Sequence, residues 1–102
     1  MARARLVLRE KVIDEEGNIV ELVIWEVPST PENPAGLRYR LAFVRQGERA
    51  PAVLYDNHHP KGHHRHIEGV TEPYAFADVD RLLLDFTANV RRIRGDTTWP
   101  RP

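Results

Sequence analysis

The sequence predicts an α+β fold, an antiparallel meander of four to five strands with one C-terminal helix packed on one face of the sheet. Two observations predict it. Short segments rich in aliphatic and β-branched residues follow one another between residues 4 and 56, and one segment with helical spacing of its apolar residues follows at 79–93. Consecutive strands followed by a single helix are typical of a two-layer α+β sandwich.

The first two strands are expected in a hairpin. Residues 4–14 lead into Glu15-Glu16-Gly17-Asn18, which has turn-forming residues and a glycine available for positive φ. Residues 19–27 have apolar side chains on both sides of the chain, so we expect a second strand that is mostly buried on both faces. Residues 28–36 contain three prolines and a glycine, which favour a loop.

The third and fourth strands are expected to pair in the same way. Apolar residues occupy every second position from Leu37 to Phe43, with Arg38 and Arg40 between them, which predicts one apolar and one solvent-facing side. Gly47-Glu48-Arg49 predicts a turn, and residues 52–56 predict a strand paired with the third. Residues 57–73 are polar and hold all five histidines. Short strand pairing around 64–68 is compatible with this segment.

The helix should begin after Asp78, a residue type suited to the N-cap, and Asp80 adds negative charge to its first turn. Arginines gather in the last turn, where cations suit the helix dipole, and Gly95 is a ready C-cap. One apolar stripe should face the sheet: Val79, Leu82, Leu83, Phe86, Val90 and Ile93.

Length and composition limit the number of domains and the classes of function that fit this chain. The 102 residues suit one domain, which we expect at 1–95, followed by a flexible C-terminal tail at 96–102. Fifteen basic residues balance fifteen acidic ones, so net charge predicts no nucleic-acid affinity, although four arginines at 29–54 allow a local basic face. The absence of cysteine excludes disulfides and thiolate sites. The longest early apolar run is three residues, so we expect a cytoplasmic protein with no membrane partner.

The segment Tyr55–His66 carries an unusual density of titratable groups. RNA cleavage by the ribose 2′-hydroxyl needs a base, an acid and a cation, and histidine suits both proton transfers because its unperturbed pKa lies near neutrality. In an extended stretch His64 and His66 point the same way, roughly 6–7 Å apart at two strand rises. Lys61 and Arg65 could stabilise the charge, although Arg65 would point away unless the chain turns.

Two other interpretations of this segment remain open from the residues alone. The His-x-His pair with His58, His59 or Asp56 could bind zinc with one position left open, but no fixed frame sets the third ligand. The histidines could also lie in a polar loop without a shared task.

Several motifs of the chain resemble the TumE family of bacterial toxins. They are Leu-Val-Leu-Arg-Glu-Lys at 6–11, Ile-Trp-Glu-Val-Pro at 24–28, Tyr39-Arg40-Leu41, Tyr55-Asp56-Asn57, Lys61-Gly62, His64-Arg65-His66 and Glu72-Pro73-Tyr74. The resemblance covers roughly residues 4–94, and Lys-Gly-x-His-Arg-His at 61–66 is its most specific element. The histidines at 58, 59 and 63 depart from the pattern, which weakens the metal interpretation.

The resemblance implies a toxin encoded beside an antitoxin that carries a helix-turn-helix domain. RNA cleavage is our inference from the chemistry of the loop, with a non-enzymatic module that blocks a cellular target, or a histidine-ligated metal enzyme, as the alternatives. RNA and a second copy of the chain are further candidate partners, and we expect no cofactor and no metal ligand. The predicted catalytic residues are Lys61, His64, Arg65 and His66, and the predicted substrate-binding residues are Tyr55, Asp56, Asn57, Arg38 and Arg40.

Overall fold

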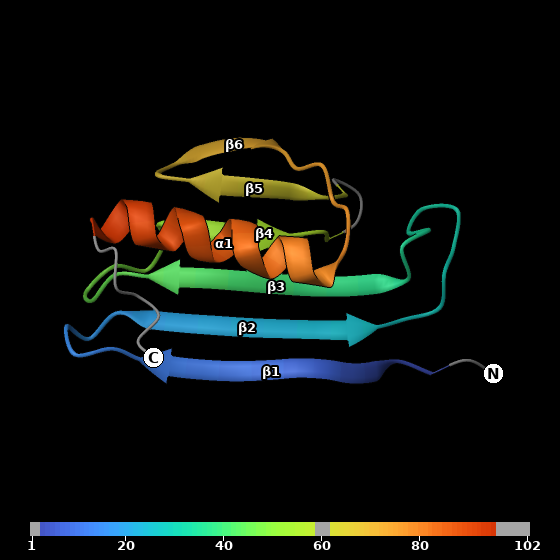
Figure 1. The fold of residues 1–102 in the computed structure, drawn as a ribbon, viewed down its shortest axis with the longest axis horizontal. Coiled ribbons are helices and arrows are strands. Elements are labelled where there is room, and N and C mark those ends of the chain that lie inside the picture. Colours follow the sequence, from blue (N-terminus) through green and yellow to red (C-terminus); the bar gives the residue numbers. More distant parts are fainter. Residues whose placement is uncertain (1–2, 59–61, 96–102) are drawn as a thin grey trace.

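The computed structural model describes residues 3–58 and 62–95, so the predicted tail at 96–102 lies outside the described residues. Six strands form one antiparallel sheet in chain order, and the helix α1 (Val79–Arg94) lies along one face of it (Figure 1). The strands are β1 (Arg5–Ile13), β2 (Ile19–Glu26), β3 (Leu37–Val44), β4 (Val53–Asp56), β5 (His64–Ile67) and β6 (Val70–Pro73). The predicted meander with a C-terminal helix on one face is confirmed.

The sheet has six strands rather than the four to five expected, because the polar segment after β4 forms a complete hairpin. Glu68 and Gly69 join β5 to β6 with φ values of 50° and 83°, as a two-residue turn of type I′ requires. Every residue of β6 is exposed at the edge of the sheet. An edge strand without a buried face leaves no apolar period in the sequence, which is why the pattern did not predict it.

The core lies between α1 and the face of the sheet that it covers. Leu82, Phe86 and Val90 are buried on the helix and pack in one cluster with buried residues of the central strands. The predicted stripe is confirmed, and its other members, Val79, Leu83 and Ile93, are partly buried against the same cluster. The expectation that β2 is mostly buried on both faces was wrong for one of them: Val20 and Ile24 are buried toward the core, but Val23 and Trp25 are half-buried because none of the described residues forms a second layer over the other face.

Both ends of the helix are fixed by the residues expected there. The Asp78 side chain accepts a hydrogen bond from the Arg81 backbone N–H at 2.8 Å, and Gly95 adopts the left-handed conformation. Arg94 then donates to Asp14 at 2.8 Å, which ties the end of α1 to the β1–β2 turn. Among the described residues, no helix is long and apolar enough to cross a membrane.

Candidate functional site on the open face of the sheet

The face of the sheet opposite α1, which we call the open face, carries polar side chains from three central strands. Antiparallel register places Arg38 opposite Trp25, and Arg40 opposite both Val23 and Asp56. Residues directly opposite in such a pair point to the same face. Since β3 turns Tyr39, Leu41 and Phe43 toward the core, the arginines between them point to the open face.

Asp56 and His64 form the tightest contact on this face. The two residues are paired across β4 and β5, and His64 Nε2 lies 2.9 Å from Asp56 Oδ1. The other ring nitrogen, Nδ1, lies 2.8 Å from the Gly62 carbonyl oxygen. The carbonyl and an ionised carboxylate can only accept, so the ring satisfies both contacts only when both nitrogens carry hydrogen. The His64 side chain is also nearly buried, with 7% of the residue exposed.

His66 shares the open face with His64, as period-two spacing predicts. The two ring centroids lie 5.2 Å apart, with the ring planes at 75°. Nδ1 of His66 lies 2.7 Å from the Thr71 hydroxyl. In the part of the chain that the structure describes, Nε2 of His66 has no hydrogen-bond partner. His66 is therefore the member of the pair with a ring nitrogen available to a ligand.

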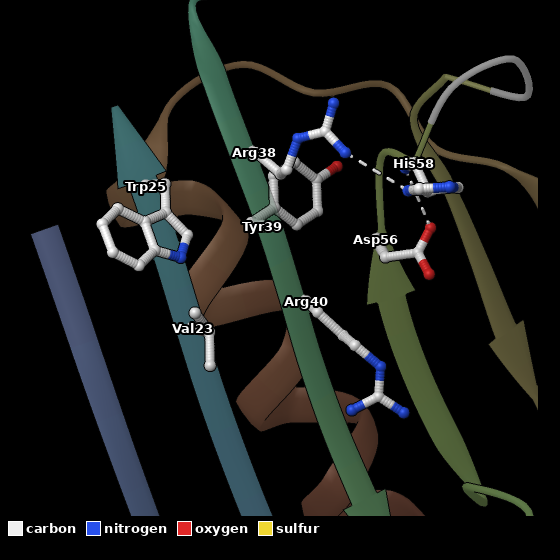
Figure 2. A pocket seen from close by; sticks show the side chains of 7 residues that line it. All are labelled: Val23, Trp25, Arg38, Tyr39, Arg40, Asp56 and His58. Atoms are coloured by element: carbon white, nitrogen blue, oxygen red, sulfur yellow. Dashed lines mark hydrogen bonds between the residues drawn. The ribbon is translucent and has the colours of Figure 1, made fainter. Parts of the chain in front are cut away.

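A cavity of about 470 Å³ lies on the open face beside Asp56 (Figure 2). Nη1 of Arg38 lies 3.3 Å from His58 Nδ1, and the His58 backbone N–H donates to Asp56 Oδ1 at 3.2 Å. The Arg40 side chain is half exposed, and its Nη1 lies 3.7 Å from Glu21 Oε1. The lining residues are Val23, Trp25, Arg38, Tyr39, Arg40, Asp56 and His58.

Arg65 and Tyr55 lie on the opposite, helix-covered face, so the structure does not bring them to the histidine pair. Arg65 Nη1 donates to the Tyr55 hydroxyl at 3.1 Å, and its Nε donates to Glu72 at 2.7 Å. Asn89 of α1 also donates to the Tyr55 hydroxyl. Tyr55 exposes none of its side chain, and its hydroxyl joins the hairpin β5–β6 to the helix.

Asn57 and His63 are built into the fold in a similar way. Asn57 accepts from the Tyr39 backbone N–H at 2.9 Å and donates to the Leu37 carbonyl at 2.6 Å, so its amide continues the pairing of β4 with β3. The His63 ring stacks on Phe76 at 4.8 Å between centroids, and its Nδ1 lies 2.8 Å from the Tyr39 hydroxyl. Burial lowers the pKa of the His63 imidazole. One of the three departing histidines thus has a packing role.

Comparison with known protein families identifies the family of this chain. Residues 2–94 match the family model described as Toxin TumE, which covers nearly the whole chain. The chain belongs to the TumE toxin family. No curated protein and no solved structure matches it. The resemblance seen in the motifs is therefore confirmed, and a toxin role with an antitoxin partner follows from the family in general terms.

The remaining predicted residues of this TumE-family toxin have mixed placements. Lys61 and His59 lie outside the described residues. Asp56, Arg38 and Arg40 lie together at the cavity, whereas Asn57 is buried by its backbone contacts. Across residues 3–58 and 62–95, no three histidine, cysteine or acidic side chains converge in a way that could hold a metal ion.

Two residues of the cavity, Trp25 and His58, are not among the substrate-binding residues that the sequence predicts. The sequence pattern places Trp25 among the apolar positions of residues 19–27, and His58, a candidate zinc ligand from the residues alone, departs from the family pattern. A signal for Trp25 was present: it alternates with Val23 on the side of β2 that pairs with the arginines of β3. Finding it required the register between the strands, which the turn at 28–36 does not specify.

Proposed function

We propose that this TumE-family toxin cleaves RNA in the cytoplasm without a metal ion, by attack of the ribose 2′-hydroxyl on the adjacent phosphate. The observation that carries the proposal is the histidine pair on the open face, with ring centroids 5.2 Å apart beside a cavity that contains Arg38 and Arg40. This reaction needs groups that accept and donate protons, and cations beside them that stabilise the charge on the phosphate.

The reaction is a transesterification followed by release of the products. The 2′-oxygen forms a bond to phosphorus while the bond from phosphorus to the 5′-oxygen breaks. A base takes the proton of the 2′-hydroxyl, and an acid gives a proton to the departing 5′-oxygen. One product ends in a 2′,3′-cyclic phosphate and the other begins with a 5′-hydroxyl, so no oxidant, reductant or metal is needed for the balance.

We assign the base to His66 and the acid to His64. His66 has Nε2 without a hydrogen-bond partner among the described residues, so it can accept a proton from substrate. His64 lies between two acceptors, Asp56 and the Gly62 carbonyl, which favour the ring that carries both hydrogens. To protonate the leaving oxygen, His64 must exchange its contact with Asp56 or with the Gly62 carbonyl for one with the substrate.

We assign to the two arginines of the cavity the stabilisation of the negative charge that develops on the phosphate during the reaction. Arg38 and Arg40 share the open face with the histidines, whereas Arg65 is held behind the sheet by Tyr55 and Glu72. We therefore assign Arg65 a positioning role, because it fixes β5 from the far side. Lys61 remains a predicted catalytic cation from its place in the motif that includes His64 and His66.

Product chemistry tests this proposal directly. Purified toxin is incubated with single-stranded RNA in the presence of EDTA, and the product termini are identified. We expect 2′,3′-cyclic phosphate ends, an unchanged rate with EDTA, and no cleavage when the scissile nucleotide lacks its 2′-hydroxyl. Loss of activity in EDTA with rescue by zinc or manganese would replace the proposal with the metal enzyme.

A non-enzymatic module that blocks a cellular target is the second candidate. It is favoured by the same exposed cavity, since Trp25, Arg38 and Arg40 could contact a partner without any proton transfer. Growth arrest by expressed protein that is folded, yet cleaves no RNA in vitro, would select this alternative. For the partner we propose an antitoxin with a helix-turn-helix domain, which the neighbouring gene should encode; homodimerisation remains a prediction that sedimentation would test.

A further inference from the structure

We infer that the open-face cavity binds one nucleotide of single-stranded RNA, with the phosphate between Arg38 and Arg40 and the base against Trp25. The inference rests on the proposed function for its choice of RNA as the substrate. It goes beyond that function because it assigns a subsite that requires no proton transfer and that Trp25 and the arginines alone define.

The sheet register arranges two parallel rows of side chains across the cavity. One row runs from Trp25 on β2 to Arg38 on β3 and on toward His58. The second row runs from Val23 through Arg40 and Asp56 to His64 on β5. Figure 2 shows the part of both rows that lines the cavity: an aromatic or aliphatic side chain, then a guanidinium, then His58 in the first row and Asp56 in the second. A ligand that is planar and apolar at one end and anionic next to it matches this order, and a nucleotide has that chemistry.

The charge of the lining is positive where a phosphate would lie. Arg38 contacts the imidazole of His58 and no carboxylate among its contacts in the described chain. Among the described residues, the ion pair of Arg40 is a long one, 3.7 Å to Glu21. Asp56, the one carboxylate among the described residues of the lining, already accepts from His64 Nε2 and from the His58 backbone N–H through the same oxygen. Two guanidiniums thus face one engaged carboxylate, and guanidinium is suited to phosphate geometry.

The apolar end of the cavity offers an aromatic surface for a base. Trp25 is half-buried on the open face, and the guanidinium of Arg9 lies 5.9 Å from the centre of its ring. Stacking of a base on the ring face that Arg9 covers requires this exposed side chain to move aside. Base–aromatic contacts tolerate any base, so the subsite should accept more than one nucleotide type.

The subsite adjoins the histidine pair and shares Arg38 and Arg40 with the proposed chemistry. Three strand spacings of about 4.8 Å each separate β2 from β5, so Trp25 lies on the order of 14 Å from the histidine pair across the sheet. Asp56 is common to both, because it lines the cavity and contacts His64. The bound nucleotide is therefore a neighbour of the scissile one, and its role is to fix the strand.

Binding of a mononucleotide tests the inference without any cleavage. The full chain is titrated with AMP, and in parallel with ribose 5-phosphate and inorganic phosphate, while the indole N–H signal of Trp25 is followed by NMR; Trp99→Phe assigns that signal. We expect AMP to bind at least about fivefold more tightly than ribose 5-phosphate. Trp25→Ala should abolish that difference. Arg38→Ala or Arg40→Ala should weaken both ligands about tenfold, and Arg49→Ala, an exposed turn arginine, should change neither.

Several results would overturn the subsite. Equal affinity for AMP and ribose 5-phosphate would show that the base makes no contact with Trp25. The same conclusion would follow if Trp25→Ala kept the difference in affinity between the two ligands. Binding of a glutamate-rich peptide at Trp25, with no nucleotide binding, assigns the cavity to a protein partner instead. RNA cleavage that proceeds normally in Trp25→Ala rejects the subsite but leaves the ribonuclease, whereas AMP binding as described without any RNA cleavage rejects the ribonuclease but leaves the subsite.

Discussion

Asp56 Oδ1 lies 2.9 Å from His64 Nε2, and the second ring nitrogen of His64 faces a backbone carbonyl at 2.8 Å. Both partners accept hydrogen bonds, so the ring satisfies both contacts when both of its nitrogens carry hydrogen. A ring in that form can donate a proton, and this is why we propose His64 as the proton donor.

The Asp56→Asn substitution should lower RNA cleavage about 10²-fold with little change in folding. A carboxamide can donate as well as accept, so the new side chain accommodates the neutral ring of His64 and no longer favours the acid. The measurement is the cleavage rate per folded molecule, with Glu10→Gln on the exposed β1 as the matched control. An unchanged rate would show that Asp56 only supports the structure.

Arg65→Gln should destabilise the domain by about 1 kcal/mol while leaving the cleavage rate of the folded fraction unchanged. The substitution removes the donors to the Tyr55 hydroxyl and to Glu72, both on the helix-covered side of the sheet. Urea unfolding gives the stability and the folded fraction, and the cleavage rate is divided by that fraction. If activity falls while stability is retained, Arg65 acts in the chemistry as the sequence pattern predicted.

Leu82→Ala should destabilise the domain by about 2–5 kcal/mol, because Leu82 has 0% exposure between α1 and the sheet. Leu84, two residues along the same helix, is 64% exposed, and Leu84→Ala is the control that should cost little. Denaturant unfolding compares the two. Similar midpoints would mean that α1 does not pack as described.

The His63 imidazole should make the domain less stable on mild acidification. Burial lowers its pKa in the folded state, so above the unfolded value of about 6.5 the ring is neutral in both states and the stability is intact. As the pH falls below that value, the unfolded chain takes up a proton that the folded chain resists, and stability is lost until the folded pKa is passed. His63→Phe retains a ring between Tyr39 and Phe76 and should show a smaller loss between pH 7 and 5 by thermal unfolding. A loss as large as that of the wild type would mean that His63 is not its source.

The fold was largely predictable because aliphatic and β-branched residues mark four strands and an apolar stripe marks the helix. Period-two alternation marks β3, and Asp78, Gly95 and the apolar stripe between them mark α1. β6 has no buried side, so no pattern marks it. Local spacing also placed His64 and His66 on one face and Arg65 on the other. The cavity could not be predicted, since Trp25 and Arg38 meet only through the pairing of two strands that a ten-residue connection separates.

The most direct test of the central claim is the single-turnover rate of RNA cleavage in EDTA by the wild type and by His66→Ala. The substrate is an oligonucleotide with one ribonucleotide in a deoxyribose chain, which allows one scissile position. We expect cleavage at that position only, and a fall in rate of about 10²–10⁴-fold in His66→Ala, with an unchanged melting temperature. Equal rates for the two proteins would contradict the assignment of the base to His66, and no cleavage by folded wild-type toxin would contradict the ribonuclease itself.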